Sequence, residues 1–208
     1  MTIEQTSAEG DLAFMRAIVE ERGSHDRSFG INYAAAGLLY GVQCLLNGWL
    51  LLGEIEAPAM VWLAIGILPT VLFIMVNVFS VWKARENPMG VGTARRAMTA
   101  AFAGGGIAIL ILASIFGMIA FERDDWTIWM LFPIVVCAVQ GAIWFTTTMI
   151  KRELWHGVTS FGWFASCFVL SVFTTDVAAF VVAMGAVLLL LMALPGMLIL
   201  RATSNQAE

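Results

Sequence analysis

The sequence predicts an all-α membrane protein, a bundle of six transmembrane helices behind a short amphipathic helix. Composition is the first reason, because 60% of the 208 residues are hydrophobic and only 12% are charged, whereas soluble domains carry about 25% charged residues. Segregation of the charges is the second. Windows without Asp, Glu, Lys or Arg cover 28–53, 57–82, 97–121, 126–150, 154–175 and 177–200. Each window can span, since a helix crosses the hydrocarbon core with about 20 apolar residues.

The windows divide the chain into a cytosolic segment, 1–29, a transmembrane domain, 30–200, and a cytosolic tail, 201–208. We expect spanning helices at about 30–53, 57–82, 97–121, 126–150, 155–174 and 177–200. Ten of the eleven basic residues fall on one side of these spans, and only Arg123 falls on the other. The positive-inside rule then places both termini in the cytoplasm.

The N-terminal segment contains a helix pattern that starts near Ser7 or Asp11 and ends at Gly23. Its apolar residues share one broad face, and its polar face is mainly acidic, unlike the basic face of a membrane-surface helix. This pattern favours docking on the bundle's own loops or on a partner protein, and a poorly ordered terminus is the alternative. The apolar face consists of Leu12, Met15, Ile18 and Val19.

The stretch 30–53 has one face of small and polar residues and an opposite face of Leu and Val. Hydrocarbon cannot satisfy amides or hydroxyls, so such a face turns toward other helices. Glycines on spanning helices predict close helix contacts. The expected packing glycines are Gly37, Gly41, Gly104, Gly105 and Gly106, and the deep tryptophans Trp144 and Trp163 are expected to pack within the bundle.

Intramembrane amides are the main candidates for a ligand or pore lining. Gln43 and Gln140 are predicted at similar depths, where they would bind each other or a small polar ligand. The structural alternative is an amide–amide contact that only holds helices together. The complete candidate lining is Gln43, Asn47, Asn77, Gln140, Ser160 and Trp163.

Catalytic signatures are missing from the sequence, so we expect neither an enzyme nor a cofactor. No ionisable Asp, Glu, Lys or Arg lies in any window, which argues against a proton-driven pump. The two histidines, His25 and His156, do not form an intramembrane pair of haem ligands. A soft-metal site is a further alternative, because thiolates bind such metals and Cys44, Cys137 and Cys167 have similar predicted depths.

Five segments resemble an uncharacterised group of small bacterial six-helix membrane proteins. The segments are DLAFMRAIVE, AAGLLYGVQCLL, VVCAVQGAIWF, FGWFAS and LLMALPG. The resemblance implies a multi-pass protein of the bacterial cytoplasmic membrane and brings no activity with it.

The leading functional hypothesis is a non-enzymatic membrane component that senses or docks. It would present its N-terminal helix and the loop 83–96 to a cytosolic protein partner, with no role for nucleic acid. The rival is a small channel or carrier for a neutral solute or cation, lined by the intramembrane amides. The sequence leaves the oligomeric state open.

The charge pattern makes a first testable prediction. A reporter enzyme that is active only in the periplasm, fused after Glu208, should give no signal, because both termini are expected inside. The same reporter inserted beside Asp124 should be active. A strong signal from the C-terminal fusion would overturn the helix count or the orientation.

Overall fold

The structure is a computed structural model that describes the backbone of residues 3–84 and 93–204 and the side chains of residues 27–82 and 96–204. Within these ranges every regular element is helical. The elements are α1 (Ile3–Leu52), α2 (Ala59–Ala84), α3 (Thr93–Arg123), α4 (Thr127–Lys151), α5 (Leu154–Val172), α6 (Val177–Leu188), a π-helical turn η1 (Leu189–Ala193) and α7 (Leu194–Ser204).

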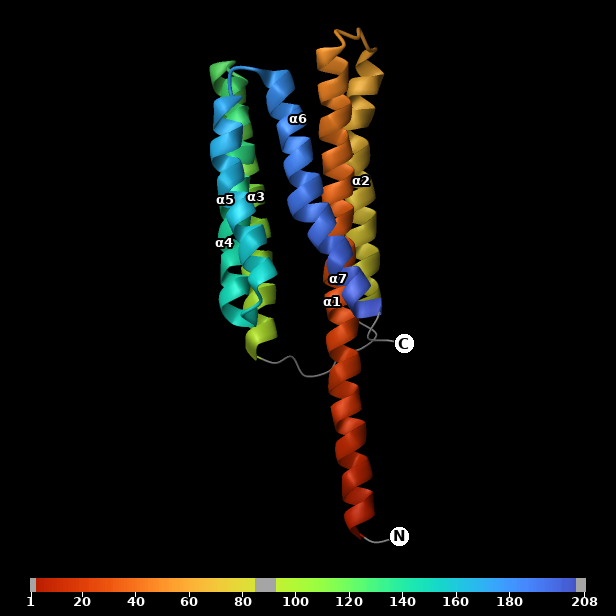
Figure 1. Cartoon of the computed structure of the whole chain (residues 1–208). Coiled ribbons are helices and arrows are strands. Elements are labelled where there is room, and N and C mark those ends of the chain that lie inside the picture. Colours follow the sequence, from red (N-terminus) through yellow and green to blue (C-terminus); the bar gives the residue numbers. More distant parts are fainter. Residues whose placement is uncertain (1–2, 85–92, 205–208) are drawn as a thin grey trace.

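The first helix corrects one sequence prediction. Instead of a separate short helix ending at Gly23, α1 is one uninterrupted helix of 50 residues that extends alone beyond the other helices (Figure 1). A glycine inside a helix costs only about 1 kcal/mol relative to alanine, so Gly23 need not end it. The side chains of Leu12, Met15, Ile18 and Val19 lie outside the described residues.

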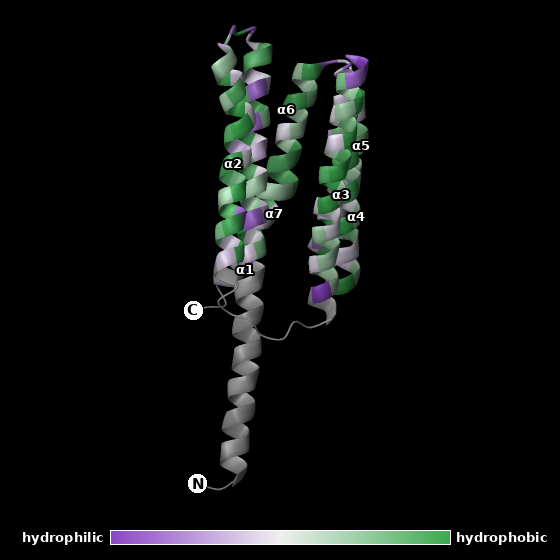
Figure 2. Cartoon of the chain, turned by 180° about the vertical axis from the view of Figure 1, so that it is seen from behind, coloured by the Kyte–Doolittle hydropathy of each residue, from purple (hydrophilic) through white to green (hydrophobic). Residues whose placement is uncertain are grey.

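Five helices of the described chain are long and apolar enough to cross a membrane. These segments are Arg27–Leu52, Ala59–Trp82, Arg96–Arg123, Thr127–Lys151 and Val177–Ser204, and hydrophobic residues dominate them (Figure 2). The remaining helix, α5, is 19 residues long and buries polar side chains, among them His156, Thr159 and Ser160. The prediction of a multi-pass membrane protein is thus confirmed, with five helices that can span.

Short turns reverse the chain between most helices. Glu54, Asp124 and Arg152 adopt positive φ values of 47°, 48° and 54°, the left-handed conformation that commonly ends a helix. Asp176 caps α6 by accepting a hydrogen bond from the backbone N–H of Ala179 at 3.0 Å. Such turns keep consecutive helices antiparallel.

A side-chain hydrogen-bonded turn lies directly before α4. The Asp125 carboxylate accepts hydrogen bonds from the hydroxyl of Thr127 at 2.5 Å and from its backbone N–H at 3.0 Å. Both bonds favour the charged carboxylate, so they lower the pKa of Asp125. This contact fixes the direction in which α4 leaves the α3–α4 turn.

The helices pack as two groups of three rods. In one group α1 packs against α2 and against the continuous rod made by α6, η1 and α7; in the other, α4 packs against α3 and α5. The two groups meet where α5 contacts α6 and where aromatic side chains of α1, α3 and α4 interlock. Figure 1 shows α6 running from the α5 side of the molecule toward α1.

The tightest contact joins α1 to the α6–η1–α7 rod through small residues. A Cβ atom added to Gly37 would lie 2.8 Å from the Cα of Ala193, and one added to Gly196 would lie 2.7 Å from the Cα of Ala34. Gly41 faces Leu189 and the backbone oxygen of Gly185 in the same way. The backbones approach so closely because no side chain separates them.

The π-helical turn interrupts the rod at this contact. The backbone N–H of Leu194 bonds to the carbonyl of Leu189, five residues earlier, and the next residue is Pro195, which has no N–H to donate. A π turn incorporates one extra residue into a helix. The π turn therefore rotates α7 relative to a continuous α-helix, and the face that contains Gly196 meets α1.

The three glycines of α3 differ from the sequence prediction. A Cβ added to Gly105 would meet the side chain of Ile143 on α4. Gly104 and Gly106 have no atom of the described chain within 4 Å of such a Cβ, so they do not pack against another helix of this chain. The prediction of packing at these two positions is wrong because α4 covers only one side of α3.

The glycine contacts make a second prediction with a built-in control. Gly37→Ala should destabilise the bundle by about 1–3 kcal/mol, because the added methyl group meets backbone atoms that cannot rotate away. Gly104→Ala should be neutral or slightly stabilising, because its site is open and alanine favours the helix. Unfolding of both variants in mixed micelles measures the difference, and equal stability would contradict the close contact.

Candidate functional site

The candidate site lies where the two groups of helices meet. We call it the aromatic junction; it comprises Phe29, Tyr33, Phe102, Trp144, Trp155, His156 and Trp163. Helices α1, α3, α4 and α5 each contribute at least one ring. Ring centroids lie 4.7 Å apart for Phe29 and Phe102 and 5.3 Å apart for Tyr33 and Trp144. These edge-on arrangements are the favoured geometry of aromatic pairs.

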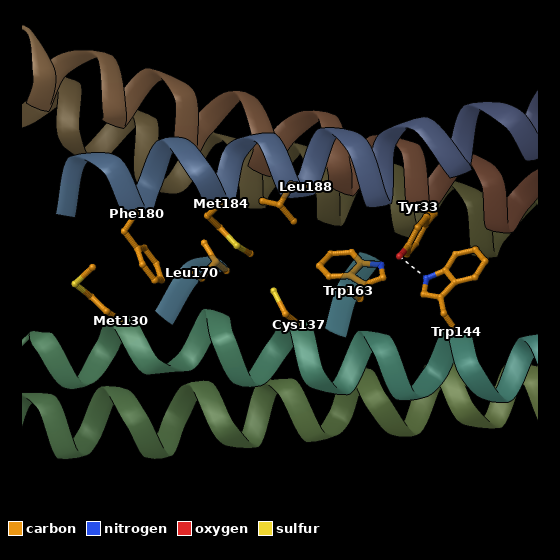
Figure 3. Close-up of a cluster of buried hydrophobic side chains, with 9 residues drawn as sticks. All are labelled: Tyr33, Met130, Cys137, Trp144, Trp163, Leu170, Phe180, Met184 and Leu188. Atoms are coloured by element: carbon orange, nitrogen blue, oxygen red, sulfur yellow. Dashed lines mark hydrogen bonds between the residues drawn. The ribbon is translucent and has the colours of Figure 1, made fainter. Parts of the chain in front are cut away.

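A hydrogen bond at the centre of the junction links α1 to α4. The indole Nε1–H of Trp144 donates to the hydroxyl oxygen of Tyr33 at 2.6 Å. The indole nitrogen of Trp163 points toward the same hydroxyl (Figure 3). Only 5% of Tyr33, 1% of Trp144 and none of Trp163 is exposed, so the burial predicted for the two tryptophans is confirmed.

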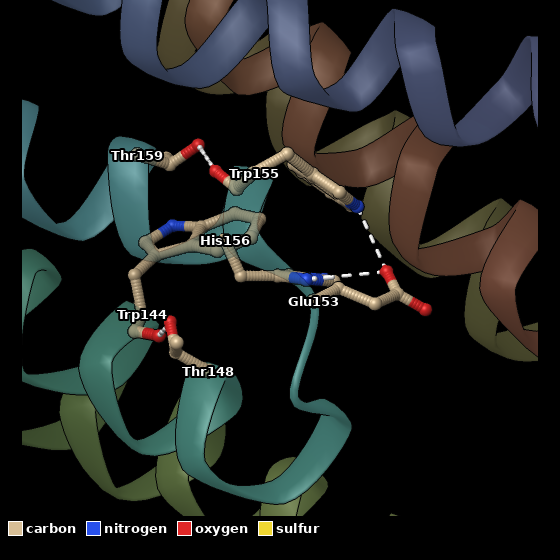
Figure 4. Close-up of polar contacts among 6 residues, drawn as sticks. All are labelled: Trp144, Thr148, Glu153, Trp155, His156 and Thr159. Carbon is tan, nitrogen blue, oxygen red and sulfur yellow. Dashed lines mark hydrogen bonds and ion pairs between the residues drawn. The ribbon is translucent and has the colours of Figure 1, made fainter.

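The second part of the junction lies at the start of α5. The rings of Trp155 and His156 are tilted by 30° to each other with centroids 3.7 Å apart, and the His156 ring also lies 5.5 Å from the Trp144 ring. The Glu153 carboxylate accepts a hydrogen bond from Trp155 Nε1 at 2.8 Å and lies 3.3 Å from His156 Nδ1 (Figure 4). Glu153 therefore fixes both rings from the edge of the bundle, where 54% of its side chain is exposed.

Three buried polar atoms in the described part of the chain lack a hydrogen-bond partner there, besides the ion-paired nitrogen of His156. They are Asn32 Oδ1, Gln140 Oε1 and Trp163 Nε1. Buried polar atoms normally bond to protein groups or to ordered water. Two of the three belong to residues that the sequence suggested as a lining, Gln140 and Trp163, and the amide of Asn32 was not singled out.

Asn32 belongs to a small polar network between α1 and α2. Its Nδ2 donates to the Ser80 hydroxyl at 2.9 Å and to the Ser28 carbonyl at 3.1 Å, and the hydroxyls of Ser28 and Ser80 also bond to each other. Polar contacts of this kind hold membrane helices together. Asn32 was not among the sequence candidates, because nothing in the pattern of a single helix indicates the serine on α2 that its amide meets.

The predicted lining residues do not converge on one channel. Ser160 is buried and donates to the Gly141 carbonyl at 2.9 Å. Gln43 lies three helical turns beyond Asn32, on the side of α1 that faces α2, and no hydrogen bond joins Gln43 to Gln140 among the described residues. Asn47 lies two helical turns after Tyr40, on the same face of α1. The ring centroids of Tyr40 and Phe73 of α2 are 5.8 Å apart, so this face also turns toward α2.

The last candidate for the lining, Asn77, is exposed on the outer surface of α2. The structure therefore does not bring the predicted lining residues together, because α1 divides its polar residues between α2, where Asn32 bonds to Ser80, and α4, where Tyr33 accepts from Trp144. Two open hollows of about 370 and 550 Å³ lie at the ends of α4 instead, the first beside Thr148 and Glu153, the second beside Thr127 and Thr174.

The three cysteines are free thiols on α1, α4 and α5. Cys167 Sγ lies 3.5 Å from the Ile134 carbonyl and 3.6 Å from the Trp163 carbonyl, in donor geometry to both. Cys137 is buried and Cys44 is half-buried. The described residues contain no group of three or more His, Cys, Asp or Glu that could hold a metal ion.

Helices of this length and hydrophobicity define an integral membrane protein with several spans. No protein-family model, no curated protein and no solved structure matches the chain. The resemblance to small bacterial membrane proteins therefore stays a prediction, and the functional argument depends on the geometry of this chain.

The junction makes a third prediction. Tyr33→Phe should destabilise the bundle by about 1–3 kcal/mol, because it leaves the buried indole N–H of Trp144 without its acceptor. The matched control is Tyr40→Phe, whose hydroxyl makes only a 3.5 Å contact with Thr70. Reversible unfolding in micelles measures both variants. A loss as large for Tyr40→Phe as for Tyr33→Phe would contradict the central role of the hydrogen bond.

Proposed function

We propose that this protein is a non-enzymatic membrane component that docks a cytosolic protein on the protruding end of α1. One observation carries the proposal: a single helix forms both the protrusion and the centre of the group that it makes with α2 and the α6–η1–α7 rod. Residues 3–26 extend about 36 Å before the spanning segment that begins at Arg27, at 1.5 Å per residue. A partner bound there would act directly on the bundle.

The topology that this function requires is part of the proposal. We infer six spans, with α5 as the sixth, and both termini in the cytoplasm of a bacterial cell. The basic residues support this orientation, since ten of eleven lie on the side of the protrusion. Pairing of α5 with α4 supports its membrane crossing, because the Ser160 hydroxyl bonds to the Gly141 carbonyl. The loop 83–96 would lie on the same side as the protrusion.

Continuity of α1 gives the docking hypothesis its mechanism. A helix bends gently unless proline, a π turn or an inserted group disrupts its hydrogen bonds. Inside the bundle α1 contacts α2, α6, η1 and α7, and Tyr33 joins it to α4. A sideways force on the protrusion would therefore reach both groups of helices. This coupling is what a sensing component needs.

The rival channel or carrier has less support from the geometry. Its lining would need Gln43, Asn77 and Gln140 to surround one space. Asn77 is exposed on the surface of α2, and Gln43 lies on the side of α1 that faces α2, away from Gln140 on α4. A soft-metal protein would need its cysteines grouped, and no such group exists among the described residues. Both remain outcomes of the experiment below.

The fourth prediction tests docking by site-specific photocrosslinking in cells. A photoreactive residue at Leu12, Met15 or Val19 should give one discrete adduct with a cytosolic protein, because helical spacing places these positions on the apolar face. The same residue at Ala13 or Ala17, on the opposite face, should give at least about tenfold less. Equal labelling of both faces, or no adduct, would refute docking.

Two further variants test the mechanical link and the rival. Gly23→Pro should interrupt α1 and weaken the cellular effect of the partner, whereas Gly23→Ala should preserve it, since proline costs about 3 kcal/mol in a helix interior. Reconstituted wild-type protein should give no solute flux. Flux that disappears in the Gln43→Leu and Gln140→Leu double variant would instead establish the channel or carrier.

A further inference from the structure

Helix α2 leaves most of its surface without a partner from its own chain. Among the described elements only α1 makes substantial contact with it, and Ser80 in its last turn is the one buried residue of its spanning window. One exposed stripe on α2 differs from the surrounding Leu, Val and Met surface because it contains a glycine, a threonine and an amide. At helical spacing this α2 stripe consists of Leu63, Gly66, Thr70, Ile74, Asn77 and Val81.

Asn77 is the unusual residue of the α2 stripe. It is exposed and makes no hydrogen bond to another described residue. It precedes Trp82 by about 7.5 Å along the helix axis, and exposed tryptophans such as Trp82 mark the membrane interface. The short Asn side chain cannot reach the interface from this depth. Facing hydrocarbon, its amide would lack every hydrogen bond that water supplies.

We propose that α2 dimerises with a second copy of this chain through the α2 stripe, with the two Asn77 amides hydrogen-bonded to each other. A two-fold axis along the membrane normal brings identical residues together at one depth. An amide has both donor and acceptor atoms, so Asn77 is its own complement. Lipid cannot replace this pairing, since acyl chains offer no hydrogen bond.

The rest of the α2 stripe fits a helix partner. In the described part of the chain no atom lies within 4 Å of a Cβ added to Gly66, so a second backbone can approach it closely. Thr70 follows four residues later, which gives the small-x-x-x-small spacing typical of paired membrane helices. The stripe borders the α1 contact, where Tyr40 reaches Thr70 at 3.5 Å. The dimer would thus leave the intramolecular packing of α2 unchanged, and it is independent of docking at the N-terminus.

Cysteine crosslinking of the full-length protein in membranes tests this surface. Under mild oxidation Asn77→Cys should form a disulfide dimer of twice the monomer mass. The matched controls are Met75→Cys and Val78→Cys, which are exposed at similar depth on other faces of α2, and wild type reports the background from Cys44, Cys137 and Cys167. Equal crosslinking at all three positions would overturn the stripe, as would an adduct with a different protein.

Dimer strength gives a second, independent measurement. Energy transfer between labelled copies in liposomes should show that Asn77→Leu needs about tenfold more protein per lipid to dimerise, the shift expected for one lost interhelical amide bond. Gly66→Ile should weaken dimerisation at least as much, and Met75→Leu should not change it. A wild type that stays monomeric at every protein-to-lipid ratio would reject the proposal.

Discussion

The close backbone contact between α1 and the α6–η1–α7 rod is the constraint on which the rest of the structure depends. Helices in lipid gain little from hydrophobic burial, so they associate through van der Waals packing and polar bonds. Gly37 meets Ala193 and Gly196 meets Ala34 with no room for a side chain. This contact holds α6 beside α1, and α6 in turn carries the connection to α5. The arrangement of the second helix group follows from it.

The aromatic junction supplies the complementary polar link between the groups. Its Tyr33–Trp144 bond joins residues 111 positions apart in sequence, and burial away from water makes an unmade bond there costly. The junction also accounts for the polar character of α5. The hydroxyls of Thr159 and Ser166 bond to carbonyls of α5, and Ser160 bonds to α4, so these groups are satisfied without water. A helix of modest hydrophobicity is thereby compatible with a membrane interior.

Sequence reasoning captured what depends on one helix at a time. Five of the six charge-free windows coincide with helices that are long and apolar enough to span, and the small-residue face of 30–53 indicated the contact at Gly37. Relations between helices were less accessible, because the rotation of α1 and of α4 about their own axes decides whether Gln43 meets Gln140, and the pattern within one helix does not contain these angles. Gly104 shows the same limit: its composition suits a contact, but α4 covers another side of α3. The continuity of α1 escaped because Gly23 weakens a helix without ending it.

The π turn at Leu189–Ala193 has a consequence for how this chain tolerates changes in length. A π turn is equivalent to one residue inserted into an α-helix, and every residue after it is rotated by about 100° relative to an uninterrupted helix. Deleting a single leucine from the run would restore regular α-helix and keep Gly196 against Ala34, because the loss of one residue and the loss of the π turn cancel. The length of this leucine run can therefore change by one residue without moving the small residues of α7 off the face that meets α1, provided that the π turn is gained or lost with the residue.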